Sequence, residues 1–100
     1  METYLSTGIR TKVIEEIRAL ANKHDIQKVI LFGSRSRGDY KERSDIDIAI
    51  LGGNGDLFAL DVDEETSTLL MYDIVNLDKA IQTELLESIQ REGIVIYEKI

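Results

Sequence analysis

Apolar residues recur every three or four positions in two long stretches of the chain, which predicts two amphipathic helices. In residues 9–25 the apolar stripe comprises Ile9, Val13, Ile17, Leu20 and Ala21. In residues 78–93 it comprises Ile81, Leu85 and Ile89. Gly93 follows the second stripe and is a plausible helix stop. Each helix should bury one face against the rest of the protein.

Four shorter segments are apolar and rich in β-branched residues, which is typical of buried strands. They are residues 28–32, 45–51, 69–75 and 94–98. A glycine-rich loop follows the second segment, and the stretch after it is ambiguous, a short helix being one interpretation. This order of helices and strands predicts one small α/β domain over residues 1–100. We expect a mixed sheet in which the second segment lies between the first and the third.

Charge and composition narrow the classes of function. The chain has 100 residues, a formal net charge of −7, no cysteine, and one histidine, His24. An acidic protein is a poor ligand for a polynucleotide, and these counts exclude disulfides and a zinc site built on thiolates or two histidines. No apolar stretch approaches the roughly 20 residues of a membrane span, and the first dozen residues lack the apolar core of a signal peptide. We therefore expect a cytoplasmic protein that does not bind membranes and for which nucleic acid is a poor default partner.

The first predicted strand ends at Gly33 and Ser34. Glycine permits a tight turn and the close approach of a ligand, and backbone N–H groups beside a hydroxyl suit a phosphate. An ordinary strand-to-helix turn could have the same sequence. Gly33 and Gly38 are spaced as in a P-loop, but Asp39 stands where the P-loop needs lysine, so a Walker-type NTPase is disfavoured.

Asp45 and Asp47 open the second predicted strand. Alternate side chains of a strand share a face, so both carboxylates should point one way and the isoleucines between them the other. Like charges this close repel each other, and a divalent cation would relieve the repulsion. Asp73 interrupts the third apolar segment and would join the pair if the two strands are neighbours. Three carboxylates can hold metal ions that clamp a phosphoryl group, whereas each aspartate alone could simply be a solvated charge.

The combined pattern resembles the GS…DxD core of the polymerase-β-like nucleotidyltransferase superfamily. The stretch GSRSRGDYKERSDIDIAI, residues 33–50, carries the resemblance. Within that superfamily the chain is most similar to the minimal MNT-domain proteins, in its short length, the RG after GS, the SDID sequence and the ending REGIVIYE. The resemblance implies an α/β (α+β) fold of the polymerase-β-like nucleotidyltransferase type, with a small mixed sheet and helices packed on one face.

The resemblance also implies roles for individual residues. Gly33 and Ser34 would bind the β- and γ-phosphates of a nucleotide. Asp45 and Asp47 would hold Mg²⁺, and Asp73 matches the third carboxylate of the family, near the attacking hydroxyl. All three aspartates would then be catalytic residues and metal ligands, with one or two Mg²⁺ ions and Mn²⁺ as a possible substitute.

A local basic segment supports nucleotide binding. Residues 35–43 contain four basic and two acidic side chains in an otherwise acidic chain. We expect Arg35 and Arg37 to attract and orient a triphosphate. Solvated loop charges are the alternative for both arginines, and the favoured interpretation for Lys41 and Arg43.

The implied reaction transfers a nucleoside monophosphate, AMP from ATP in the leading hypothesis, to a hydroxyl group. MNT proteins are commonly paired with a small helical HEPN protein, often as the antitoxin of an RNase toxin, so a tyrosine of a HEPN-like partner is the expected acceptor. One alternative is transfer to a small molecule or an RNA end. The other is a non-catalytic module that neutralises a partner by occupying its surface.

Overall fold

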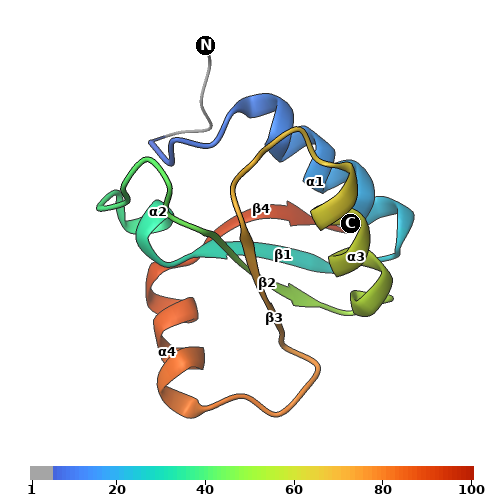
Figure 1. Ribbon diagram of the computed structural model, residues 1–100. Coiled ribbons are helices and arrows are strands. Elements are labelled where there is room, and N and C mark those ends of the chain that lie inside the picture. Colours follow the sequence, from blue (N-terminus) through green and yellow to red (C-terminus); the bar gives the residue numbers. More distant parts are fainter. Residues whose placement is uncertain (1–5) are drawn as a thin grey trace.

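The computed structural model describes residues 6–100, which form a four-stranded sheet with helices on both sides (Figure 1). The elements are α1 (Thr11–Lys23), β1 (Lys28–Phe32), α2 (Ser34–Arg37), β2 (Ile46–Leu51), α3 (Gly55–Glu65), β3 (Tyr72–Asn76), α4 (Thr83–Glu92) and β4 (Ile94–Glu98). Strands β1 and β4 have the predicted bounds. The other elements differ from the predicted ones at one or both ends.

The sheet has the strand order β3-β2-β1-β4. Strand β1 is antiparallel to both β2 and β4, and β2 is parallel to β3. The predicted mixed sheet is therefore confirmed, with β2 between β1 and β3. This order brings the aspartates of β2 and β3 onto neighbouring strands.

Side-chain alternation along β2 gives the sheet two differently covered faces. Ile46, Ile48 and Ile50 are buried in the main core with α1 and α3. On the other face, Ala49 packs with Phe32 and with Ile89 of α4. The expected packing of helices on one face is therefore correct for α1 and α3 but wrong for α4. The continuous apolar run of β1 explains this, because a strand that is apolar on both sides can be covered on both sides.

Strand β3 begins at Tyr72, three residues later than the apolar run that predicted it. The preceding loop is bound to α1, since the backbone N–H and the hydroxyl of Ser67 both donate to Glu16 at 2.7 Å. Pairing with β2 starts only where Ile46 N–H donates to Met71 O, at 2.9 Å. Leu69 is fully exposed and Met71 is 65% exposed, so apolar character here does not mean burial.

The ambiguous segment after the glycine-rich loop is helix α3. The Asn54 side chain accepts a hydrogen bond from Leu57 N–H at 3.2 Å and caps the helix. Phe58 and Val62, one turn apart, anchor α3 in the core. Helix α4 begins five residues later than its apolar periodicity suggested, because the preceding chain turns at Asp78, whose carboxylate accepts from Gly52 N–H at 2.8 Å.

Between residues 6 and 100, no helix has the length and apolar character needed to cross a bilayer. The expectation about a signal peptide concerns in part residues 1–5, which lie outside the described residues.

Candidate active site at the Asp45–Asp47–Asp73 corner

The register of the parallel strands β2 and β3 brings the three predicted aspartates to one corner of the sheet. Asp47 lies directly beside Asp73 in the pairing. Asp45 precedes β2, and continuing the same register places it beside Met71, whose carbonyl already accepts from Ile46 N–H. These side chains share the face that also carries Ala49, because alternate residues of a strand point to the same side.

Gly33 lies at this corner because it follows the last residue of β1, Phe32, which pairs with Asp47. Its φ of 77° lies in the left-handed region that favours glycine. A methyl group on Gly33 would overlap Asp47 Oδ2, so the close approach of backbone and carboxylate requires this residue. Ser34 begins α2 immediately afterwards. Ser34 and the start of this helical turn therefore adjoin the carboxylate corner through Gly33.

Asp47 carries a carboxylate in an unfavourable electrostatic environment. Partial burial raises the pKa of Asp47 above its ordinary value, and the negative charges of Asp73 and Asp45 raise it further. The positive charges of Arg37 and Arg35 act in the opposite direction without cancelling this effect. Asp45 and Asp73 are exposed to solvent, whereas Asp47 is half-buried.

Arg35 holds the loop between α2 and β2 in place. Its side chain is buried, with the residue only 2% exposed, and the guanidinium donates to three backbone carbonyls. These are Thr7 O at 2.9 Å, Ser44 O at 3.1 Å and Glu42 O at 3.2 Å. The centre of the Tyr40 ring lies 4.8 Å from the guanidinium carbon. Arg35, which we expected to bind the nucleotide, therefore binds backbone carbonyls, including that of Ser44 immediately before Asp45. No sequence signal distinguishes an arginine that binds phosphate from one that binds backbone carbonyls.

Arg37 connects α2 with α4. Its Nε donates to Asp39 at 3.1 Å and its Nη1 to Glu92 at 3.0 Å. The hydrogen bond to Asp39, followed by that to Glu92, raises the pKa of Arg37. The side chain is 43% exposed and its charge acts on Asp47, so Arg37 is the more accessible of the two arginines to an incoming phosphate.

The corner has the chemistry of a divalent cation site. Asp45, Asp47 and Asp73 supply hard oxygen ligands of the kind that Mg²⁺ takes, and burial together with the charges of Asp73 and Asp45 raises the pKa of Asp47. Within residues 6–100, no three His, Cys, Asp or Glu side chains are already arranged around one point to hold an ion. Mg²⁺ is usually held by one or two carboxylates together with the phosphates of a bound nucleotide, and these residues fit that arrangement.

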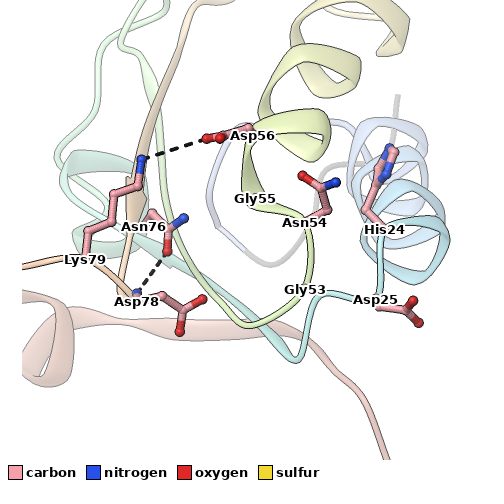
Figure 2. Close-up of a pocket in the computed structure, with 9 residues that line it drawn as sticks. All are labelled: His24, Asp25, Gly53, Asn54, Gly55, Asp56, Asn76, Asp78 and Lys79. Carbon is pink, nitrogen blue, oxygen red and sulfur yellow. Dashed lines mark hydrogen bonds and ion pairs between the residues drawn. The ribbon is translucent and has the colours of Figure 1, made fainter.

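A polar hollow of about 530 Å³ lies at the opposite end of β2 (Figure 2). Asn76, which pairs with Ile50, contributes to it, as do the loop before α3 and the ion pair of Lys79 with Asp56 at 3.8 Å. His24 also lines it and, as the residue at the C-terminal end of α1, contacts Asp61 at 2.7 Å. The sequence predicts no site at this end, and none of the three aspartates lines the hollow.

Comparison with known proteins identifies the family. The family described as Polymerase beta, Nucleotidyltransferase, matches residues 15–100. A protein of Methanocaldococcus jannaschii named "Putative protein adenylyltransferase MJ0604" is 39% identical over 98 residues, covering 86% of this chain and 96% of that protein.

Solved structures give the same result. A crystal structure of a toxin–antitoxin with AMP-PNP contains a similar chain, with a TM-score of 0.68 and 25% identity over 86% of this chain and 73% of that one. A structure described as "putative minimal nucleotidyltransferase" has a TM-score of 0.63 and 26% identity, covering 81% of this chain and 86% of that one. The predicted fold and the predicted enzyme class are confirmed, and the chain belongs to the polymerase-β nucleotidyltransferase family, whose members generally use divalent metals.

Proposed function

We propose that this protein transfers AMP from ATP, with Mg²⁺, to a tyrosine of a small helical HEPN-like partner protein. The observation that carries the proposal is the register of β2 and β3. It sets Asp47 beside Asp73, and the pairing of β1 with β2 sets Asp47 next to Gly33. Ser34 and the start of α2 follow Gly33 and would offer phosphate-binding groups there. Binding of phosphate and activation of a hydroxyl can therefore take place at one corner.

The proposed reaction is a displacement at the α-phosphorus of ATP. The tyrosine oxygen forms a bond to that phosphorus, the bond to the bridging oxygen of pyrophosphate breaks, and pyrophosphate leaves with the electron pair. Gly33, Ser34 and Arg37 would hold the β- and γ-phosphates, which become the leaving group. Asp73, the exposed carboxylate, would accept the tyrosine proton.

Asp45, Asp47 and Asp73 would hold the divalent ion. The ion would neutralise phosphate charge and lower the pKa of the attacking hydroxyl. Arg35 would act indirectly, because its hydrogen bond to Ser44 O fixes the residue before Asp45. The protein's main contribution is positioning, which is typical of phosphoryl transfer.

Two relatives support a protein acceptor. One is named for protein adenylylation, and the other is part of a toxin–antitoxin with AMP-PNP. The similarity to the toxin–antitoxin chain also supports a rival function, an inhibitor that covers the surface of its partner, since a toxin can be blocked without being modified. Transfer to a small molecule or an RNA end is the remaining rival.

The test uses intact mass spectrometry of a HEPN-like protein encoded beside this chain, after incubation with ATP and Mg²⁺. The proposal predicts increments of one adenylate on a tyrosine with the wild type, and none with Asp45→Asn/Asp47→Asn. An unmodified partner that is nevertheless inhibited in a stable complex would favour the occupancy function. Labelling of RNA or a small molecule, with the partner untouched, would favour the other rival.

A further inference from the structure

A hollow of about 490 Å³ opens beside the carboxylate corner and is lined by Arg43, Leu69, Leu70 and Met71. Arg43 lies two residues before Asp45, and Met71 two residues before Asp73. The two sides of this acceptor hollow, as we name it, are joined where Ile46 N–H donates to Met71 O at 2.9 Å. Because Met71 continues the register of β3 beside Asp45, the hollow adjoins the carboxylate corner.

The loop that carries the apolar residues of the acceptor hollow is anchored at several points. Ser67 donates hydrogen bonds to Glu16, and its carbonyl oxygen accepts one from the Arg10 guanidinium. Leu70 N–H donates to Thr68 Oγ1 at 3.1 Å. Further along, Tyr72 donates its hydroxyl hydrogen to Thr66 Oγ1 at 2.9 Å. The loop nevertheless holds Leu69 entirely in solvent and leaves Met71 65% exposed. Large apolar side chains presented on a fixed loop are typical of a contact surface.

Charge on the rim of the acceptor hollow indicates the kind of partner. Arg43 is exposed, and no carboxylate in the described part of the chain lies within salt-bridge distance of it. An arginine that has no ion-pair partner and lies beside apolar side chains complements a segment with an acidic residue next to an apolar one. The chain as a whole carries −7 and the three aspartates lie nearby, so the positive charge of Arg43 is a local exception.

We propose that the acceptor hollow binds the acceptor polypeptide, and this inference rests on the proposed function. An apolar side chain of the acceptor inserts between Leu69 and Met71, and an acidic side chain pairs with Arg43. The acceptor tyrosine, a few residues away in the same segment, then reaches Asp73. The surface thus selects which tyrosine receives the nucleotide.

The other exposed apolar residues are less suitably placed. Leu57 and Leu60 are 48% and 52% exposed, but they belong to α3, which packs on the opposite face of the sheet from the carboxylates. Leu60 therefore provides a matched control for Leu69, since both are exposed leucines and only one borders the site.

The experiment measures the Kd of the complex with the HEPN-like partner by calorimetry, and the KM values for partner and ATP by pyrophosphate release. Leu69→Ser/Met71→Ser should weaken the complex and raise the partner KM by about tenfold or more, as expected for losing two buried apolar contacts. The KM for ATP should stay within about twofold. Arg43→Glu should weaken the complex most at low salt, and Leu60→Ser should leave every value within about twofold.

Several outcomes would overturn the inference. One is a partner Kd in Leu69→Ser/Met71→Ser equal to that of Leu60→Ser, with transfer intact. Another is a dimer of this chain that the double variant disrupts, because the hollow would then join two copies. Weaker binding in the double variant without any AMP transfer by the wild type would support the surface and contradict the proposed function. A wild type that neither binds nor modifies the partner would contradict both.

Discussion

Asp47 is placed where a cation could bind, but its charge destabilises the metal-free folded protein. Its carboxylate is partly buried and lies beside Asp73, and both burial and the neighbouring charges raise its pKa. A raised pKa means that the folded state holds a proton more readily than the unfolded chain. The free energy of unfolding therefore falls as pH rises from the ordinary aspartate pKa through the higher pKa of the folded state, and it stays lower above that interval.

Asp47→Asn should therefore stabilise the metal-free protein at neutral pH, and this gain should disappear in acid, where the wild-type carboxyl is protonated. For a domain of this size, each kcal/mol corresponds to a melting temperature change of about 4–8 °C. Thermal unfolding in EDTA from about pH 3 to about pH 7 measures the effect. Asp56→Asn is the control, since the Asp56 side chain is 89% exposed and should change stability little. A variant less stable than the wild type at neutral pH would contradict the argument.

Gly33 gives a second prediction for a single residue. Gly33→Ala places a methyl group against Asp47 Oδ2 at a φ of 77°, so it should cost about 1–3 kcal/mol of stability and lower AMP transfer about tenfold or more. Gly38→Ala is the matched control, because Gly38 has a φ of 91° but open space around the added methyl group. The control should lose stability through backbone strain and keep transfer. Equal transfer by both variants would remove Gly33 from the site.

Arg35 shows where residue-level prediction from sequence reaches its limit. Glycine, serine and aspartate at the corner could be predicted because their chemistry and spacing are distinctive. An arginine in the same loop can bind phosphate or backbone carbonyls with the same guanidinium, and only the fold decides between them. Here Thr7, Glu42 and Ser44 take its donors.

At the scale of elements, the strands were predictable to the extent that apolar residues coincide with burial. Strand β1 matches its apolar run because the strands and helices around it bury Val29, Leu31 and Phe32. Strand β4 also matches its run, although Ile96 is its only buried residue and Val95 is 46% exposed. The start of β3 was placed too early, since Leu69 and Met71 are apolar and exposed. The position of α4 on the second face was also missed, because periodicity shows that a helix has an apolar side but not which side of a sheet receives it.

Helix α4 gives a prediction at this scale. Ile89 is 1% exposed and packs with Phe32 and Ala49, so Ile89→Ala should lower the free energy of unfolding by about 2–4 kcal/mol. Leu86 lies on the same helix but is 37% exposed, and Leu86→Ala should cost less than about 1 kcal/mol. Urea unfolding of both variants measures the difference. Similar losses would show that α4 is not held by this small second core.

At the scale of the whole molecule, the fold creates two different ends of the sheet. One end has the three aspartates, Gly33 and the apolar hollow, and the other has the polar hollow around Asn76. The three aspartates repel each other in the metal-free protein, and a nucleotide with its cation would relieve that repulsion. Because Mg²⁺ prefers to share its ligands with phosphate, the ion and ATP should bind together better than either binds alone.

The most direct test of the central claim is the melting temperature of wild type and Asp45→Asn with Mg²⁺, with ATP, and with both. A ligand that binds only the folded state at about 100 times its Kd adds about 2.7 kcal/mol to stability. The wild type should therefore show its largest rise with Mg²⁺ and ATP together, and Asp45→Asn should lose that rise while remaining folded. A nucleotide-dependent rise that survives unchanged in Asp45→Asn would show that the carboxylate corner is not the metal–nucleotide site.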